Sequence, residues 1–153
     1  MGYQCVFFMI DQNDLEKLIK YNINDLIEKL DELEKTGKSY STFLDYFLGL
    51  RLFFSSIMMD FKIENIENLA WFTGTHKINF YEDDEINFFE KYENFENIVK
   101  LLEKIDIDID KLLEKNIENF ETTEIIDEYN DLLTFYKEAL ENKKTIIYYQ
   151  KQF

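Results

Sequence analysis

The chain has 153 residues, 46% hydrophobic and 32% charged, a balance that fits one folded domain rather than a disordered or fibrous chain. Its 32 acidic and 17 basic residues give a net charge of −15. This charge argues against binding to nucleic acid or a membrane surface, because both need exposed Lys and Arg. The single cysteine, Cys5, excludes an internal disulfide and, with one histidine, a Cys/His zinc site. A reducing cytoplasm is the expected compartment.

The first 37 residues predict a strand followed by a helix. Tyr3 to Ile10 is a run of aromatic and aliphatic residues, which is typical of a buried strand. Asp11 or Asn13 can then cap a helix, because leucines and isoleucines repeat at helical spacing as far as Leu33. Gly37 can take a positive φ just beyond this helix and so end it.

The second predicted helix runs from Thr42 to about Ser56, with Ser39 or Ser41 as its cap. Its apolar residues lie nearly all round the helix, which favours a central helix covered on most sides. A short helix is a further candidate around Ile63 to Trp71.

The rest of the chain alternates between strand and helix patterns. Strands are predicted at Lys77 to Tyr81 and Thr145 to Gln150. The acidic run between Glu82 and Glu85 predicts a turn or a solvated helix start, because four adjacent like charges repel one another. Amphipathic segments follow at Glu93–Lys104, Asp108–Ile117 and Thr122–Asn142.

These patterns predict a mostly helical α+β fold. A small sheet of N-terminal, central and C-terminal strands is expected to pack against the amphipathic helices. With no linker and no internal repeat, residues 1–153 are expected to form a single domain.

Several segments resemble the YfbM-like family of bacterial proteins, a domain of unknown function. They are MGYQCVFFMIDQNDLEKLI at the start, LDYFLGLRLFF (44–54), ENIVKLLEKIDIDIDKLLEK (96–115) and YNDLLTFYKEALENKKTIIYYQ (129–150). The chain departs from the family on the second helix, where Tyr46 or Phe47 stands in place of a tryptophan. The resemblance implies an α+β fold and a small cytoplasmic protein. It implies no reaction, so no catalytic residue is carried over.

The residues that could carry chemistry each have a plainer interpretation. His76 is a candidate general base, but no serine or cysteine nucleophile neighbours it in the sequence, which favours a surface histidine. Cys5 lies inside an apolar strand and is expected to be a core residue. Tyr148 and Tyr149 should point to opposite sides of their strand, which makes one of them a candidate for the surface.

The sequence IDIDID begins like a calcium loop, with acids at Asp106, Asp108 and Asp110. An EF-hand then needs Gly at its sixth position and Glu at its twelfth, where this chain has Lys111 and Ile117. The match fails, and a turn between two helices is the expected structure. No cofactor or metal is expected, and the four glycines cannot build a phosphate-binding loop.

The acidity is concentrated in one region. Residues 64–131 hold 20 acids and 6 bases, a net charge of −14, whereas residues 1–63 carry −3 and residues 132–153 carry +2. Such self-repulsion is not needed for solubility alone, so we expect a surface that binds a basic partner protein. The residues expected to contact it are those of the two densest acidic runs: Glu82, Asp83, Asp84, Glu85, Asp106, Asp108 and Asp110.

Three functions remain open from the sequence. The first is a non-enzymatic immunity or inhibitor protein that neutralises a basic, nuclease-type bacterial toxin. The second is a small enzyme that uses His76 with nearby carboxylates. The third is a housekeeping protein whose acidity reflects the codon bias of an AT-rich genome, which the many Asn, Lys and Ile residues also suggest.

Overall fold

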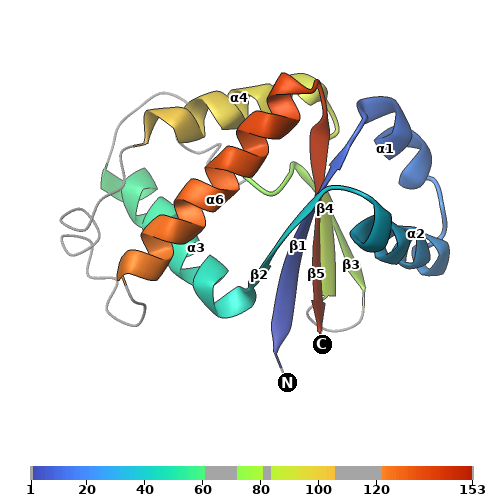
Figure 1. Ribbon diagram of the computed structural model, residues 1–153, viewed down its shortest axis with the longest axis horizontal. Coiled ribbons are helices and arrows are strands. Elements are labelled where there is room, and N and C mark those ends of the chain that lie inside the picture. Colours follow the sequence, from blue (N-terminus) through green and yellow to red (C-terminus); the bar gives the residue numbers. More distant parts are fainter. Residues whose placement is uncertain (1, 61–71, 81–83, 106–121, 153) are drawn as a thin grey trace.

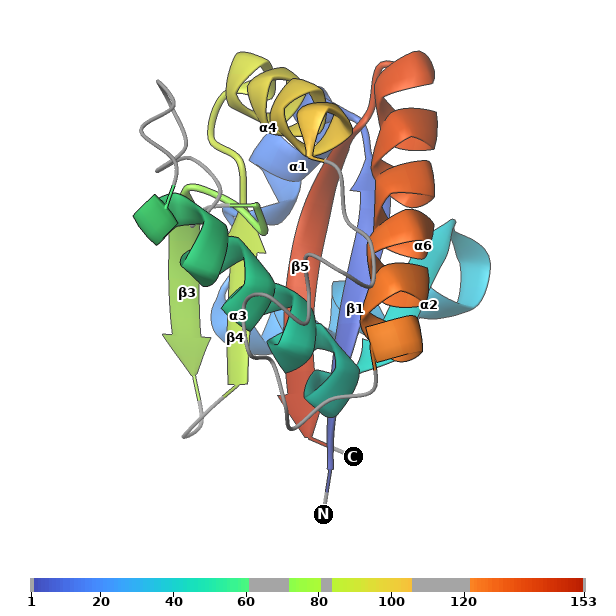
Figure 2. The same ribbon diagram turned by 90° about the vertical axis from the view of Figure 1, so that its left-hand side faces the viewer.

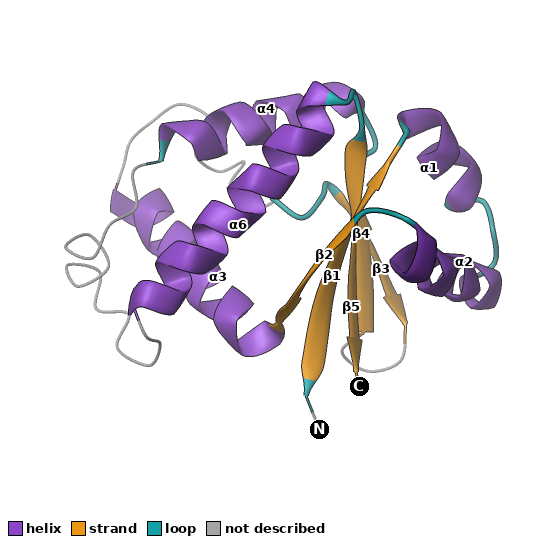
Figure 3. Ribbon diagram, in the orientation of Figure 1, coloured by secondary structure: helices purple, strands orange, loops and turns teal. Residues whose placement is uncertain are grey.

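The computed structural model describes residues 2–60, 72–80, 84–105 and 122–152. Over these ranges the chain forms a five-stranded sheet with helices on both sides, which confirms the predicted mostly helical α+β class (Figures 1 and 3). In chain order the elements are β1 (Tyr3–Ile10), α1 (Gln12–Leu18), α2 (Ile23–Thr36), β2 (Ser39–Phe43), α3 (Leu44–Asp60), β3 (His76–Phe80), β4 (Asp84–Phe88), α4 (Tyr92–Lys104), α6 (Thr122–Glu141) and β5 (Thr145–Gln152). Across the described ranges, no helix has the length and hydropathy needed to cross a membrane.

The five strands lie in the order β2-β1-β5-β4-β3, and every neighbouring pair is antiparallel. β1 and β5 pair over their full length, from Tyr3 opposite Gln152 to Ile10 opposite Thr145. The expectation that the N-terminal and C-terminal strands belong to one sheet is therefore confirmed, and the two strands are direct neighbours in it. β2 and β3 form the two edges of the sheet.

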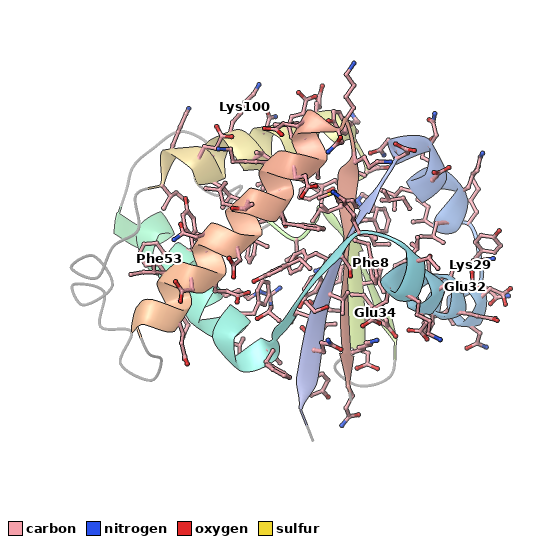
Figure 4. The ribbon with its side chains drawn as sticks, in the orientation of Figure 1. Phe8, Lys29, Glu32, Glu34, Phe53 and Lys100 are labelled. Atoms are coloured by element: carbon pink, nitrogen blue, oxygen red, sulfur yellow. The ribbon has the colours of Figure 1, made fainter. Side chains whose placement is uncertain are left out.

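The sheet separates two hydrophobic cores, one on each face. Figure 1 shows the sheet nearly edge-on, with α3, α4 and α6 on one side and α1 and α2 on the other. Alternation along β1 supplies both cores, because Cys5 and Phe7 face the first group of helices and Val6 and Phe8 face the second. Figure 4 shows Phe8 on the side of α2 and Phe53, from α3, on the opposite side.

The predicted single helix as far as Leu33 is wrong, because the chain forms two helices there, α1 and α2. Asn22 separates them, since its side chain accepts a hydrogen bond of 2.9 Å from the backbone N–H of Asp25 and so caps α2. Gly37 does end α2, but it does not use the positive φ that glycine allows, because its φ is −100°. Glycine instead permits a close approach there, since an added Cβ would lie 3.0 Å from the backbone oxygen of Leu33.

Two strands were not predicted from the sequence. β2 occupies the residues expected to cap the second helix, so α3 begins at Leu44 rather than Thr42. β4 contains part of the acidic run that was expected to be a turn. Among the described residues, α3 is exposed along one side, at Leu48 and Leu52, and buried on its other sides at Phe47, Leu50, Phe53 and Phe54, which agrees with a helix covered on most sides. The segments predicted around 63–71 and 108–117 lie outside the described residues.

The hairpin of β3 and β4 depends on Gly74. Its φ is +146°, and an added Cβ would lie 2.5 Å from the backbone nitrogen of Phe88. Only glycine fits this position without strain. The next residue, Thr75, donates its backbone N–H to the carbonyl oxygen of Phe88 over 2.9 Å, which holds the start of β3 against the end of β4.

Candidate protein-binding surface

Two of the acids predicted to bind a partner lie in strand β4. Asp84 is partly exposed, whereas Glu85 is buried, so the expected solvated turn is wrong at Glu85. The other five, Glu82, Asp83, Asp106, Asp108 and Asp110, lie outside the described residues. The role of this set in partner binding stays a prediction.

Glu85 is buried because two cations reach it. Lys77, on the neighbouring strand β3, lies 2.7 Å from one carboxylate oxygen, and Arg51, on α3, lies 3.6 Å from the other. The Arg51 guanidinium also stacks over the ring of Phe47 at 5.0 Å. Arg51, the only arginine of the chain, thus links α3 to strand β4 through Glu85.

His76 lies on the exposed edge strand β3, as the plainer interpretation predicts. Its ring stacks on Phe88, and its Nε2 is 3.5 Å from a carboxylate oxygen of Glu90. Glu90 is itself well exposed, so this pair is open to solvent. A His–carboxylate pair of this kind can carry a proton, but nothing described around it excludes water or positions a nucleophile.

The tyrosine pair near the end of β5 faces both cores. Tyr148 belongs to the core beneath α3 and α6, and Tyr149 to the core beneath α1 and α2. Both are buried, so the expectation that one ring lies at the surface is wrong. The Tyr148 hydroxyl donates to Gln150 over 2.8 Å and lies 3.2 Å from the sulfur of Cys5.

Cys5 is fully buried, as predicted. Burial raises the pKa of its thiol to about 11, so the thiol is protonated at neutral pH. A protonated and inaccessible thiol cannot act as a nucleophile.

The side of α6 that faces strand β2 carries a line of carboxylates. Spacings of three, four and seven residues place Glu124, Asp127, Asp131 and Glu138 along one side of the helix, over roughly 21 Å. We call these four residues the acidic ledge. Lys38 forms an ion pair with Glu138. Among the described residues, no cation is within salt-bridge distance of the other three.

Glu128 lies beneath the acidic ledge and joins α6 to β2. It accepts hydrogen bonds from the Tyr40 hydroxyl (2.6 Å) and the Thr42 hydroxyl (2.9 Å). Burial raises the pKa of Glu128, and the charge of Asp131 adds to the increase. Burial also raises the pKa of Tyr40, together with its hydrogen bond to Glu128. The ledge therefore adds negative charge beside a carboxylate that is already unfavourably buried.

Strand β2 runs alongside the acidic ledge. Figure 2 shows α6 on the outer side of β1, while α3 crosses the middle of the sheet. Thr42 and Tyr40 point toward α6, whereas Ser39, Ser41 and Phe43 are exposed on the other face. In the described part of the chain no strand pairs with the outer side of β2.

The sequence contained the signal for the acidic ledge. The helix predicted from Thr122 to Asn142 matches α6, and its apolar face could have been used to place the acids on the opposite sides. The predicted surface instead consists of acids that are adjacent in the sequence. Such runs do not include carboxylates that lie three or four residues apart and that a helix brings onto one side.

The described residues were also compared with the requirements of a small-ligand or metal site. A groove of about 480 Å³ lies between α1, α2 and the end of β1, and two smaller hollows of about 310 and 290 Å³ lie nearby. None of these three is lined by His76. A search of the described residues finds no group of three or more His, Cys, Asp or Glu residues arranged to hold a metal ion.

Comparisons with known proteins support the fold. The structure is similar to the crystal structure of YfbM from Escherichia coli, a protein of unknown function, with a TM-score of 0.63 and 13% sequence identity. The match covers 99% of this chain and 100% of that one, so the chain has a YfbM-like fold. No protein-family model and no curated protein sequence matches the chain.

Proposed function

We propose that the chain is a non-enzymatic protein that binds a basic partner protein, and that it acts as the immunity or inhibitor protein of a nuclease-type bacterial toxin. The acidic ledge is the observation that carries this proposal. Three of its carboxylates, Glu124, Asp127 and Asp131, have no described cation to pair with, so their mutual repulsion is a cost to the folded protein. A partner rich in Lys and Arg would relieve that repulsion on binding.

A nuclease is a suitable partner because its substrate is a polyanion. The surface that binds nucleic-acid phosphates carries Lys and Arg, and an acidic protein that covers this surface blocks the substrate. Charge complementarity also speeds association, which an inhibitor of a toxin needs. This reasoning concerns the acidic ledge and does not require the residues of the 82–85 run to be exposed.

The test is co-expression with the product of the neighbouring gene. We expect that product to stop growth, and we expect this chain to restore growth and to co-purify with it at low salt. Protection should be lost on reversing the ledge charges with Glu124→Lys, Asp127→Lys and Asp131→Lys. The matched control reverses three exposed acids on the opposite layer of helices, at Asp14, Glu16 and Glu28.

Two results would contradict the proposal. One is a neighbouring product that is harmless or that remains toxic in the presence of this chain. The other is protection that survives reversal of the ledge but not reversal of the control acids. Full protection by both reversed variants would show that the acidic ledge does not bind the toxin, whereas a neighbouring product that is harmless would favour the housekeeping alternative, in which acidity reflects codon bias.

The enzyme alternative rests on His76 and Glu90. Their separation of 3.5 Å is compatible with proton transfer, but the pair is exposed on an edge strand. His76→Asn would distinguish the two functions, because it should abolish an enzymatic activity and leave protection from a toxin unchanged.

A further inference from the structure

We propose that β2 is the docking strand for the partner: an extended, Lys- and Arg-rich segment adds to the outer edge of β2 and forms a sixth strand alongside the acidic ledge. This inference rests on the proposed function, because it assumes that the partner is a basic protein. It adds the mode of binding, which is pairing between backbones together with contacts between charged side chains.

In the part of the chain that the structure describes, the outer edge of β2 lacks the sequence features that prevent a further strand from pairing. Exposed edge strands present unpaired N–H and C=O groups, and natural proteins protect them with charged residues, proline or a bulge. β2 has the sequence SYSTF, which contains no charged residue and no proline. Ser39 and Ser41 are exposed, and all five residues pair in unbroken register with β1, from Phe8 opposite Ser39 to Gln4 opposite Phe43.

The acidic ledge supplies the charge for this added strand. Side chains of a strand alternate between the two faces, so every second residue of the added segment would lie on the same face as Tyr40 and Thr42, toward α6. Alternate residues of the added segment would be about 7 Å apart along it. The ledge carboxylates are spaced at roughly 5 to 10 Å along the helix, within reach of successive Lys or Arg side chains.

A second copy of this chain is a poor occupant for the same site. If two β2 strands paired edge to edge, the acidic ledges of the two molecules would be brought close together. Asp127 and Asp131 would then face like charges without a described cation between them. Charge therefore selects against self-pairing and in favour of a basic segment.

The opposite edge of the sheet is a weaker candidate. β3 carries His76 and Lys77, and the side chain of Lys77 is 55% exposed even though it pairs with Glu85. A basic segment approaching β3 would meet this positive charge. Edge charges of this kind are a common protection against strand addition.

The inference can be tested with a synthetic peptide of nine alternating Lys and Val residues carrying a fluorescent label. We expect fluorescence polarisation to detect binding at low salt, and amide hydrogen exchange by NMR to slow for residues in 39–43. The same peptide with N-methylated backbone amides keeps its charge but cannot pair as a strand. It should bind at least tenfold more weakly.

A pair of variants separates the β2 edge from bulk electrostatics. Ser41→Lys places one positive charge on the β2 edge, whereas Asn79→Lys places the same charge on the exposed face of β3. We expect about a tenfold loss of peptide affinity for the first variant and less than a twofold change for the second. Circular dichroism should confirm that both variants are folded.

The outcomes distinguish the docking site from the proposed function. Equal binding of the methylated and unmethylated peptides, or slowed exchange only outside residues 39–43, would overturn docking on β2 while leaving a basic partner possible. If the Ser41→Lys variant restored growth as well as the native chain does, docking on β2 would also be overturned, and binding to a basic partner would stand. Failure of the unmethylated peptide to bind at low salt would overturn docking on β2 directly.

Discussion

β2 and β3 lie at opposite edges of the same antiparallel sheet, and each is preceded by a glycine, yet different interactions hold them. β3 is fixed by the close approach of Gly74 to the backbone of Phe88 and by the ion pairs of Glu85. β2 is joined to α6 by the hydroxyl groups of Tyr40 and Thr42, which donate hydrogen bonds to Glu128. The comparison shows that the β3 edge requires a glycine and is held by ion pairs, whereas β2 is uncharged and is joined to an acidic helix.

The largest difference between the edges is expected at the two glycines. Gly74→Ala should lower the free energy of unfolding by about 3 kcal/mol, because a Cβ at a φ of +146° would lie 2.5 Å from the nitrogen of Phe88. Gly37→Ala, ahead of β2, should cost about 1 kcal/mol or less, because its φ of −100° suits any residue and the nearest atom is 3.0 Å away. Urea unfolding measures both. Equal losses would contradict the close approach at β3.

A smaller difference is expected from the ion pairs. Glu85→Gln should cost about 1–2 kcal/mol, because Lys77 and Arg51 lose the carboxylate between them and the buried oxygens lose charged donors. The matched change near β2 is Glu138→Gln, which breaks an exposed pair with Lys38 and should cost less than about 0.5 kcal/mol. Thermal unfolding of the two variants compares them. A greater loss for Glu138→Gln would show that the β2 edge carries the stronger electrostatic contacts.

The smallest effect is a pH dependence at β2. The pKa of Glu128 is raised in the folded protein, so its contribution to stability is greatest below the unfolded pKa and is lost as pH rises through the folded pKa. The free energy of unfolding of Glu128→Gln, relative to the native chain, should therefore increase from pH 4 to pH 7. Asp127→Asn, at an exposed neighbouring position, is the control and should show a weaker trend. A difference that falls over this range would contradict the raised pKa.

Elements with a strong periodic signal were predictable from the sequence. The apolar runs that became β1 and β5 were predicted almost to their ends, and so were the amphipathic helices α4 and α6. The pairing of β1 with β5 followed from their shared apolar character, because two such strands need a common core.

The remaining elements depended on contacts that the local sequence does not reveal. β4 was missed because Glu85 is an unfavourable strand residue until Lys77 and Arg51 neutralise it. The break before α2 was missed because asparagine was attributed to codon bias, whereas Asn22 caps a helix. The apolar face of α6 was enough to place the ledge acids on the outer side of that helix, but only the hydrogen bonds of Glu128 show that this side lies next to β2.

The order of the strands has a consequence for how the chain folds during synthesis. β1 is made first, but the neighbour that pairs along its whole length, β5, emerges more than 130 residues later. Until then one edge of β1 and the apolar side chains of Val6 and Phe8 lack their main partner. Closure of so long a loop predicts slow, late and cooperative folding. The nascent chain is therefore an expected client of chaperones that shield apolar strand edges.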